Sequence, residues 1–208
     1  MPQLHADTLL IQFAKEPVSG RVKTRMMPHL GAEQACSLHR DLLLWTCRTL
    51  TRAGLADVEL WVSGNSGHSD FGQCLSMGIS GVRAQQGADL GKRMFHAISE
   101  GLKIYRKVIL VGSDCPGIDA SYLGKAITAL DCQPLVIGPA SDGGYVLIGA
   151  TEVWSSLFEG VSWGSSEVFA QTKERIAALE KQYVELDVLA DIDRPEDLTL
   201  WHEIRNNA

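Results

Sequence analysis

The 208-residue sequence has no apolar run long enough to cross a membrane, since a run such as Val108–Val111 is far short of the roughly 20 residues that a spanning helix needs. It has no basic stretch ahead of its first apolar segment, so the opening MPQLHADTLLIQ does not resemble a secretory signal. Its five cysteines are odd in number and form no C-x-x-C pair, which argues against zinc and fits reduced thiols. We therefore expect a cytoplasmic protein without a membrane span.

The sequence also lacks an excess of basic residues. It has 19 Lys and Arg against 25 Asp and Glu, a net charge of −6, so no broad basic surface for nucleic acid is expected. Neither a Walker phosphate loop nor a G-x-G-x-x-G dinucleotide fingerprint occurs. Cys115 has no His partner suggested by the sequence, and the six His show no metal-binding spacing. Nucleophilic catalysis and a His-based metal site are therefore not expected.

Strand-like and helix-like segments alternate along the chain without a linker or an internal repeat, which favours one α/β domain over residues 1–208. The segment Gly143–Gly149 follows a strand beginning at Leu135–Ile137 after only a short turn, so we expect these two to be antiparallel neighbours. The fold class is therefore α/β, with a mixed, mostly parallel sheet and helices on both faces. The other expected strands are Asp7–Ala14, Asp57–Ser63, Gly81–Gln85, Lys107–Gly112 and Tyr183–Val188, and the expected helices are Ala32–Ala53, Asp89–Leu102, Ser121–Leu130, Ser165–Lys181 and Pro195–Arg205.

A basic stretch follows the first predicted strand, at the strand end where such sheets bind ligands. Gly20 lets the backbone approach a ligand, and Lys and Arg side chains neutralise phosphate oxygens. A solvated loop with chance basic residues is the alternative, but the placement favours phosphate binding. The basic residues of this stretch are Lys15, Arg21, Lys23 and Arg25.

A second stretch combines a helix start with polar residues. Asp89 can cap the helix that begins there, and Gly91 permits tight packing against the sheet. Packing does not explain why Gln85, Gly87 and Arg93 gather at the same end, whereas a helix N-terminus favours anions. We therefore expect this stretch to contribute to an anion site.

Two aspartates follow later strands. Asp114 comes directly after Lys107–Gly112, where a hard oxygen ligand suits Mg²⁺ or Mn²⁺, although an Asp before Pro is also common in turns. Asp142 lies in an Asp-Gly turn between two apolar strands, which is first of all a hairpin signal. As an alternative, Asp142 faces the cleft as a base or as a partner for a sugar hydroxyl.

The C-terminal DIDRPEDL segment has two interpretations. Asp193 and Glu196 have the spacing of a capping box for the last helix. Asp191 is not needed for the cap and could reach a metal held by Asp114. Trp163 lies in a loop before a helix, where it could stack on a base or a sugar.

Taken in order, these stretches resemble the bacterial predicted glycosyltransferases of the nucleotide-diphospho-sugar transferase superfamily, formerly a domain of unknown function, some of which are linked with arsenosugar biosynthesis. A related group, the 2-phospho-lactate guanylyltransferases, has a similar basic loop and terminal Asp-x-Asp. The motifs that carry the resemblance are FAKEPVSGRVKTRM (Phe13–Met26), QQGADLGKRM (Gln85–Met94), VGSDCPG (Val111–Gly117), GPASDGGYVLIG (Gly138–Gly149), Trp163 and DIDRPEDL (Asp191–Leu198).

The resemblance implies a GT-A-like Rossmann-type domain whose basic loop and Gln85–Arg93 hold a nucleotide. It places Asp114 at a metal site for Mg²⁺ or Mn²⁺, and the guanylyltransferases add Asp191 and Asp193 as candidate metal ligands. Gly143, Gly144 and Trp163 are the candidate substrate-binding residues.

The leading interpretation is a metal-dependent glycosyltransferase that moves a sugar from a nucleotide-diphosphate sugar to a small-molecule acceptor, with Asp142 activating the acceptor hydroxyl. A nucleotidyltransferase that joins an NTP to a phosphorylated small molecule and releases pyrophosphate is the alternative. A non-catalytic nucleotide-binding protein is the third. The sequence does not indicate the oligomeric state.

Overall fold

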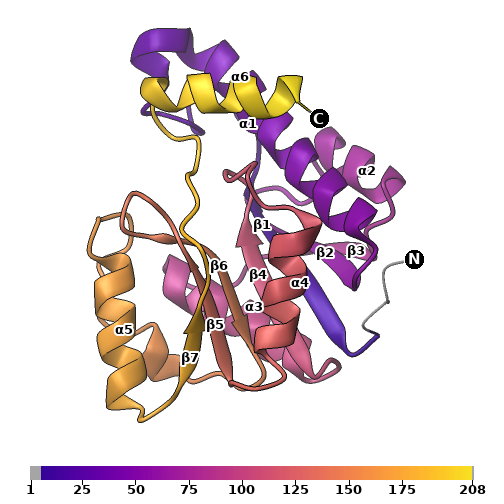
Figure 1. The fold of residues 1–208 in the computed structure, drawn as a ribbon. Coiled ribbons are helices and arrows are strands. Elements are labelled where there is room, and N and C mark those ends of the chain that lie inside the picture. The colour runs from indigo at the N-terminus through magenta and orange to yellow at the C-terminus, as the bar shows by residue number, and fades with distance from the viewer. Residues whose placement is uncertain (1–5, 208) are drawn as a thin grey trace.

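The computed structural model describes residues 6–207, which form one seven-stranded sheet in the order β3-β2-β1-β4-β6-β5-β7 with helices on both faces (Figure 1). Residues 1–5, which begin the segment expected not to be a signal, lie outside the described part. The strands are β1 (Thr8–Lys15), β2 (Asp57–Ser63), β3 (Gly81–Ala84), β4 (Lys107–Gly112), β5 (Leu135–Pro139), β6 (Tyr145–Ala150) and β7 (Tyr183–Glu185).

The sheet is parallel except for β6, which runs antiparallel to both β4 and β5. The expected mixed sheet is therefore confirmed, and so is the hairpin between β5 and β6. The central strand β4 is buried from Lys107 to Val111, because helices cover both faces, and its sequence KVILVG is accordingly a continuous apolar run after Lys107.

Helices cover both faces of the sheet. One apolar core joins α1, α2 and α4 to one face, and a second joins α3 and α5 to the other. A smaller core packs α6 against α1, with the Trp45 and Trp201 rings edge to face at 5.3 Å. The helices are α1 (Met27–Ala53), α2 (Ser69–Ser76), α3 (Leu90–Leu102), α4 (Ala120–Ala129), α5 (Val168–Ala178) and α6 (Leu198–Asn206), with short 3-10 turns at Ser155–Leu157 and Pro195–Asp197.

Three helices differ from the sequence prediction. The helix α1 starts five residues early, but Gly31 at φ 76° and ψ 166° breaks it, so the regular part begins at the predicted Ala32. The sequence reading missed α2, whose segment is rich in Gly and Ser; His68 caps it by accepting a hydrogen bond from the Asp70 amide. The helix α5 is shorter than expected because Gly164–Glu167 form turns before it. In the described part of the chain, no helix is long and apolar enough to span a membrane.

Candidate functional site

The carboxyl ends of the parallel strands surround a pocket of about 610 Å³, which we call the central pocket. It lies at the edge of the sheet where α/β folds bind ligands. Residues from β1, β2 and β4 meet the basic loop and the start of α3 there. Its lining residues are Phe13, Ala14, Lys15, Arg21, Val22, Lys23, Thr24, Arg25, His39, Ser63, Gln85, Leu90, Arg93, Gly112, Ser113, Asp114 and Asp193.

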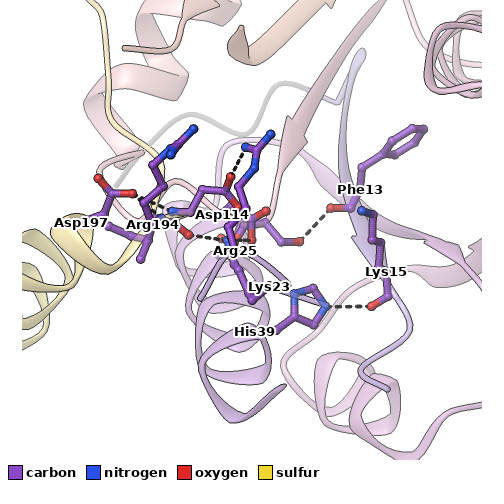
Figure 2. A network of polar contacts seen from close by, with 12 residues as sticks. Phe13, Lys15, Lys23, Arg25, His39, Asp114, Arg194 and Asp197 are labelled. Carbon is purple, nitrogen blue, oxygen red and sulfur yellow. Dashed lines mark hydrogen bonds and ion pairs between the residues drawn. The ribbon is translucent and has the colours of Figure 1, made fainter. Parts of the chain in front are cut away.

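Lys23 is the buried centre of a charged network (Figure 2). Its backbone adopts φ 48°, a left-handed conformation that is uncommon outside glycine. Its ammonium donates to the carbonyl oxygen of Ile192 and lies 2.8 Å from Asp114 Oδ1. Burial opposes ionisation of Asp114, but the charge and the hydrogen bond of Lys23, together with the charges of His39 and Lys15, keep the pKa of that carboxyl below its usual value. Lys23 thus ties the basic loop to the end of β4 and to the C-terminal segment.

Arg25 holds the second expected metal ligand. Its guanidinium donates to Asp193 Oδ2 at 2.5 Å, and this hydrogen bond raises the pKa of Arg25 above its already high value. Lys23 is also 4.0 Å from Asp193 Oδ1. Two of the three carboxylates expected to bind metal, those of Asp114 and Asp193, are therefore paired with basic side chains.

Asp191 has a different environment. Burial, followed by the negative charges of Asp142 and Asp114, raises the pKa of Asp191 to about 6. Asp191, Asp142 and Asp193 line a neighbouring cavity of about 380 Å³, the acidic pocket, whose other lining residues are Arg25, Ser141, Gly164, Ser165, Ser166, Arg194 and Asp197.

The donor set fits a divalent cation only in part. Asp191 and Asp142 offer hard oxygen atoms whose mutual repulsion a cation would relieve. Asp114 and Asp193 would first have to give up Lys23 and Arg25. Accordingly, no group of three or more His, Cys, Asp or Glu side chains is placed to hold a metal within residues 6–207.

The remaining predicted cations lie at the pocket wall. The side chains of Lys15 and Arg21 are exposed there. Arg93 is held from two sides, because its Nε donates to the carbonyl oxygen of Gly87 and its NH1 to Ser63 Oγ, both at 3.0 Å. Gln85 Nε2 donates to the backbone carbonyls of Ala14 and Trp61 at 3.2 and 2.9 Å, which bridges the ends of β1 and β2.

Three glycines and one cap shape the same region. Asp89 accepts a hydrogen bond from the Lys92 amide at 2.8 Å and caps α3, as expected. Gly87 at φ 139° leaves no room for a side chain, since a Cβ would lie 2.7 Å from the Arg93 nitrogen, whereas Gly20 at φ 80° faces open space. Gly91 packs against Trp163 rather than against the sheet, with a Cβ position 2.6 Å from the indole ring.

Asp142 forms the hairpin turn that its spacing predicts. Its Oδ1 accepts a hydrogen bond from the Gly144 amide at 2.9 Å. Gly143 adopts φ 91°, and a Cβ there would lie 2.1 Å from the Ser166 carbonyl oxygen, so the turn fits tightly against the start of α5. The turn also carries Asp142 to the wall of the acidic pocket, so the hairpin and the cleft-facing placement are both present.

The expected cap at the last helix was wrong. Asp197, and not Glu196, accepts hydrogen bonds from the amides of Asp193 and Arg194, at 2.9 and 2.7 Å. The short 3-10 turn shifts the capping carboxylate by one residue. This leaves the Asp193 carboxylate for Arg25.

Sequence reasoning missed the support behind the pocket. His39, on α1, lies with Nε2 2.9 Å from the Lys15 carbonyl oxygen, and burial lowers its pKa. Ser113 Oγ donates to the Phe13 carbonyl at 2.8 Å and accepts from Gln12 Nε2 at 2.9 Å. Ser113 could have been noticed beside Asp114, but nothing local in the sequence marks His39.

The letters G-x-S-x-G occur once, at Gly160–Gly164, but they do not form a nucleophile elbow. The segment precedes α5 and does not follow a strand. Ser162 Oγ lies 3.4 Å from Gln171 Nε2. Ser162 is therefore a loop residue.

A smaller cavity of about 190 Å³, the apolar pocket, adjoins the central pocket and shares Phe13, Leu90 and Gly112 with it. Trp163 lies here, so the predicted substrate contacts Gly144 and Trp163 line the same cavity. Its other lining residues are Met94, Leu110, Asp142, Tyr145, Val146, Leu147, Ile148, Gly164, Ser165 and Val168.

Known proteins share this architecture. A candidate nucleotide-diphospho-sugar transferase from Desulfovibrio desulfuricans G20 superposes with a TM-score of 0.86 at 30% identity, over 98% of this chain and 89% of that one. The inositol-1-phosphate CTP transferase from T. maritima gives 0.59 at 17% identity, over 97% and 95% of the two chains. Rv0371C from Mycobacterium tuberculosis H37Rv, solved with manganese, gives 0.58 at 14%, over 95% and 98%. The last two show similarity of fold alone, and no curated protein matches.

The family follows from two of these comparisons. A family model described as an uncharacterized protein conserved in bacteria (DUF2064) matches residues 46–165, which is more than half of the chain. The D. desulfuricans relative is similar over nearly the whole length. The resemblance based on the motifs is thereby confirmed, and the chain belongs to the DUF2064 family of bacterial proteins, with the fold of a nucleotide-diphospho-sugar transferase.

Proposed function

We propose that this protein is a glycosyltransferase that moves a sugar from a nucleotide-diphosphate sugar to a small-molecule acceptor. The observation that carries the proposal is the central pocket, where basic side chains from five positions surround the carboxyl ends of β1 and β4. Its volume of about 610 Å³ suits a ligand of nucleotide size. The 30% identical relative is itself described as a candidate transferase of this class.

The basic residues and Asp142 have different roles in the proposed reaction. Lys15, Arg21 and Arg93 line the pocket and stabilise the negative charge that develops on the leaving diphosphate. Lys23 keeps the loop in place, because its ammonium is bound to the Ile192 carbonyl and to Asp114. Asp142 takes the proton of the acceptor hydroxyl.

A divalent cation, Mg²⁺ or Mn²⁺, is part of the proposal. Asp191 would be its first ligand, and Asp114 and Asp193 would join it on giving up Lys23 and Arg25, which leaves Asp142 to act as the base. When bound, the cation neutralises diphosphate charge. The manganese in the structure of Rv0371C, which has the same fold, supports this assignment.

Nucleotidyl transfer is the second candidate, because the T. maritima neighbour of the same fold is a CTP transferase. In that case a phosphorylated molecule attacks the α-phosphate of an NTP and pyrophosphate leaves. The products separate the candidates, since glycosyl transfer yields an NDP.

The test begins with binding, which needs no acceptor. Thermal unfolding with NTPs, NDPs and NDP-sugars, each with and without Mn²⁺, should show the highest midpoint with an NDP-sugar. Replacing Arg21 with Ala should weaken NDP binding about tenfold and leave nucleoside binding unchanged, because only phosphates need the charge. Arg48→Ala, at an exposed position on α1 outside the pocket, is the matched control.

The outcomes discriminate between the candidates. Stabilisation by NDP-sugar with release of NDP supports glycosyl transfer, and pyrophosphate release from an NTP supports the alternative. Nucleotide binding without turnover of any donor leaves a non-catalytic binding protein. If no nucleotide stabilises the protein, the proposed use of the central pocket is wrong.

A further inference from the structure

The apolar pocket is continuous with the central pocket but differs from it in chemistry. Phe13, Leu90 and Gly112 belong to both cavities. Beyond them the basic residues end, and none of Lys15, Arg21, Lys23, Arg25 or Arg93 reaches the apolar pocket. A ligand that spans both cavities therefore meets positive charge at one end and apolar side chains at the other.

Aromatic and aliphatic groups form the wall of the apolar pocket. The rings of Tyr145 and Trp163 meet edge to face at 6.4 Å, and the Tyr145 hydroxyl points to the Met94 sulfur at 4.0 Å. Burial raises the pKa of Tyr145, so this ring is uncharged. Val168 is buried, belongs to none of the three core clusters and lines the cavity.

The structure leaves one large apolar side chain uncovered at this point. Leu90 begins α3 at the junction of the two pockets and is 43% exposed. The pocket shape is also fixed from behind, since Gly91 allows Trp163 to lie directly against α3. The cavity is thus built into the fold and is not a loose gap between side chains.

Apart from the Tyr145 hydroxyl and the Trp163 indole nitrogen, the polar side chains of the lining are those of Asp142 and Ser165. Asp142 lines both the apolar and the acidic pocket, and Ser165 lies beside it. A sugar ring or a base carries polar atoms around its edge, and burying them among Met94, Tyr145 and Val168 would cost their hydrogen bonds to water. The lining fits a body without such atoms.

We propose that the apolar pocket is the acceptor subsite and that the acceptor is a small amphipathic alcohol, with its hydroxyl at Asp142 and a compact apolar body between Trp163 and Val168. This inference rests on the proposed function, which supplies the hydroxyl with a donor in the adjoining pocket. Donor selection and acceptor selection then lie on opposite sides of Phe13 and Leu90.

Binding of a simple probe tests the subsite without turnover. Benzyl alcohol, titrated by saturation-transfer NMR, should bind the wild type, while glycerol should not. Val168→Phe fills the pocket and should weaken benzyl alcohol binding about tenfold or more, since a single methylene group in an apolar pocket is worth roughly 10- to 200-fold. Val188→Phe makes the same change at a position that is 59% exposed and outside the pocket, and should have no effect.

A second variant keeps the test possible if Val168→Phe does not fold. Val168→Ala enlarges the cavity with little disturbance and should shift the preference toward the larger 2-naphthylmethanol. Retention of probe binding with a saturating NDP supports an acceptor subsite. Displacement of benzyl alcohol by NDP-sugar, or equal probe binding by Val168→Phe and the wild type, overturns it. Probe binding in a protein that binds no nucleotide would refute the proposed function while leaving the apolar subsite intact.

Discussion

At the scale of single residues, the site depends on side chains that bind the protein itself. Lys23 was expected among the phosphate-binding residues, yet its ammonium is bound to Ile192 and Asp114. The sequence indicated the charge of this loop but not the partners, because these lie more than 90 positions along the chain. Arg21, by contrast, remains exposed at the pocket wall.

His39 should make stability depend on pH. Burial lowers its pKa from the ordinary 6.5, so the folded state takes up its proton at lower pH than the unfolded state. The unfolded state then binds more protons below about pH 6.5, and stability falls as pH falls from there toward the lowered folded pKa. His39→Gln should flatten this part of the profile.

The measurement is the free energy of urea unfolding at pH 7.5 and 5.5. His202→Gln, at an exposed position on α6, is the control and should keep the wild-type difference. A His39→Gln profile as steep as that of the wild type would contradict the assignment.

At the scale of elements, strands were easier to predict than caps. Period-two alternation in the sequence defined Asp57–Ser63, and a continuous apolar run defined Lys107–Gly112, both to the residue. A cap depends on the local path of the backbone, and the 3-10 turn at Pro195–Asp197 moved it from Glu196 to Asp197. A shift of one residue cannot be read from the spacing of acidic side chains.

The corrected cap predicts opposite outcomes for neighbouring residues. Asp197→Ala should lower the free energy of unfolding by about 1 kcal/mol, the usual cost of losing a helix cap. Glu196→Ala, at an exposed position, should change it by less than about 0.5 kcal/mol. Urea unfolding of the two variants decides, and a larger loss for Glu196→Ala would restore the original capping box.

Close packing of α3 against Trp163 predicts that two Gly→Ala substitutions in helices have opposite effects on stability. Gly91→Ala forces the indole and Phe158 to move, because its Cβ would lie 2.6 and 2.9 Å from them, and should cost about 1–3 kcal/mol. Gly124→Ala, in α4 with no atom within 4 Å, should stabilise by about 0.5–1 kcal/mol. Thermal unfolding measures both, and only Gly91→Ala should alter the near-ultraviolet circular dichroism of tryptophan. Equal stabilisation would show that Trp163 is not fixed by α3.

At the scale of the whole molecule, the sequence predicted the sheet and the sheet edge at which the candidate site residues lie. It predicted less well which of their side chains contact one another. The basic loop, Gln85, Arg93 and Asp114 line one pocket, and Asp142 and Asp191 line the next. The order of the strands brings these segments to the same edge of the sheet, so the motifs alone were sufficient to predict that they line one region. The supporting contacts of His39 and the neutralisation of Asp193 depend on tertiary packing, which local patterns do not encode.

The C-terminal segment predicts a coupling between a distant anchor and the site. Trp201 is 3% exposed and packs on Trp45 of α1, and Trp201→Ala should lower stability by about 3–5 kcal/mol. Because α6 anchors the segment that carries Asp191 and Asp193, nucleotide affinity should also fall several-fold.

Affinity should be measured by calorimetry at a temperature where every variant is folded. Trp154→Ala removes a half-buried tryptophan on the other face of the sheet, where it contacts Lys181, and should reduce stability alone. Unchanged nucleotide affinity in Trp201→Ala would show that the packing of α6 does not influence the site.

The bond between Lys23 and Ile192 joins positions 169 residues apart. At roughly 5–20 residues per second of synthesis, the loop leaves the ribosome about ten to thirty seconds before its partner exists. During that interval the Lys23 ammonium has no Ile192 carbonyl oxygen to bind, so a nascent chain cannot assemble the complete central pocket. Translation that stops after β7 but short of Ile192 would therefore yield a chain with all seven strands but without this bond.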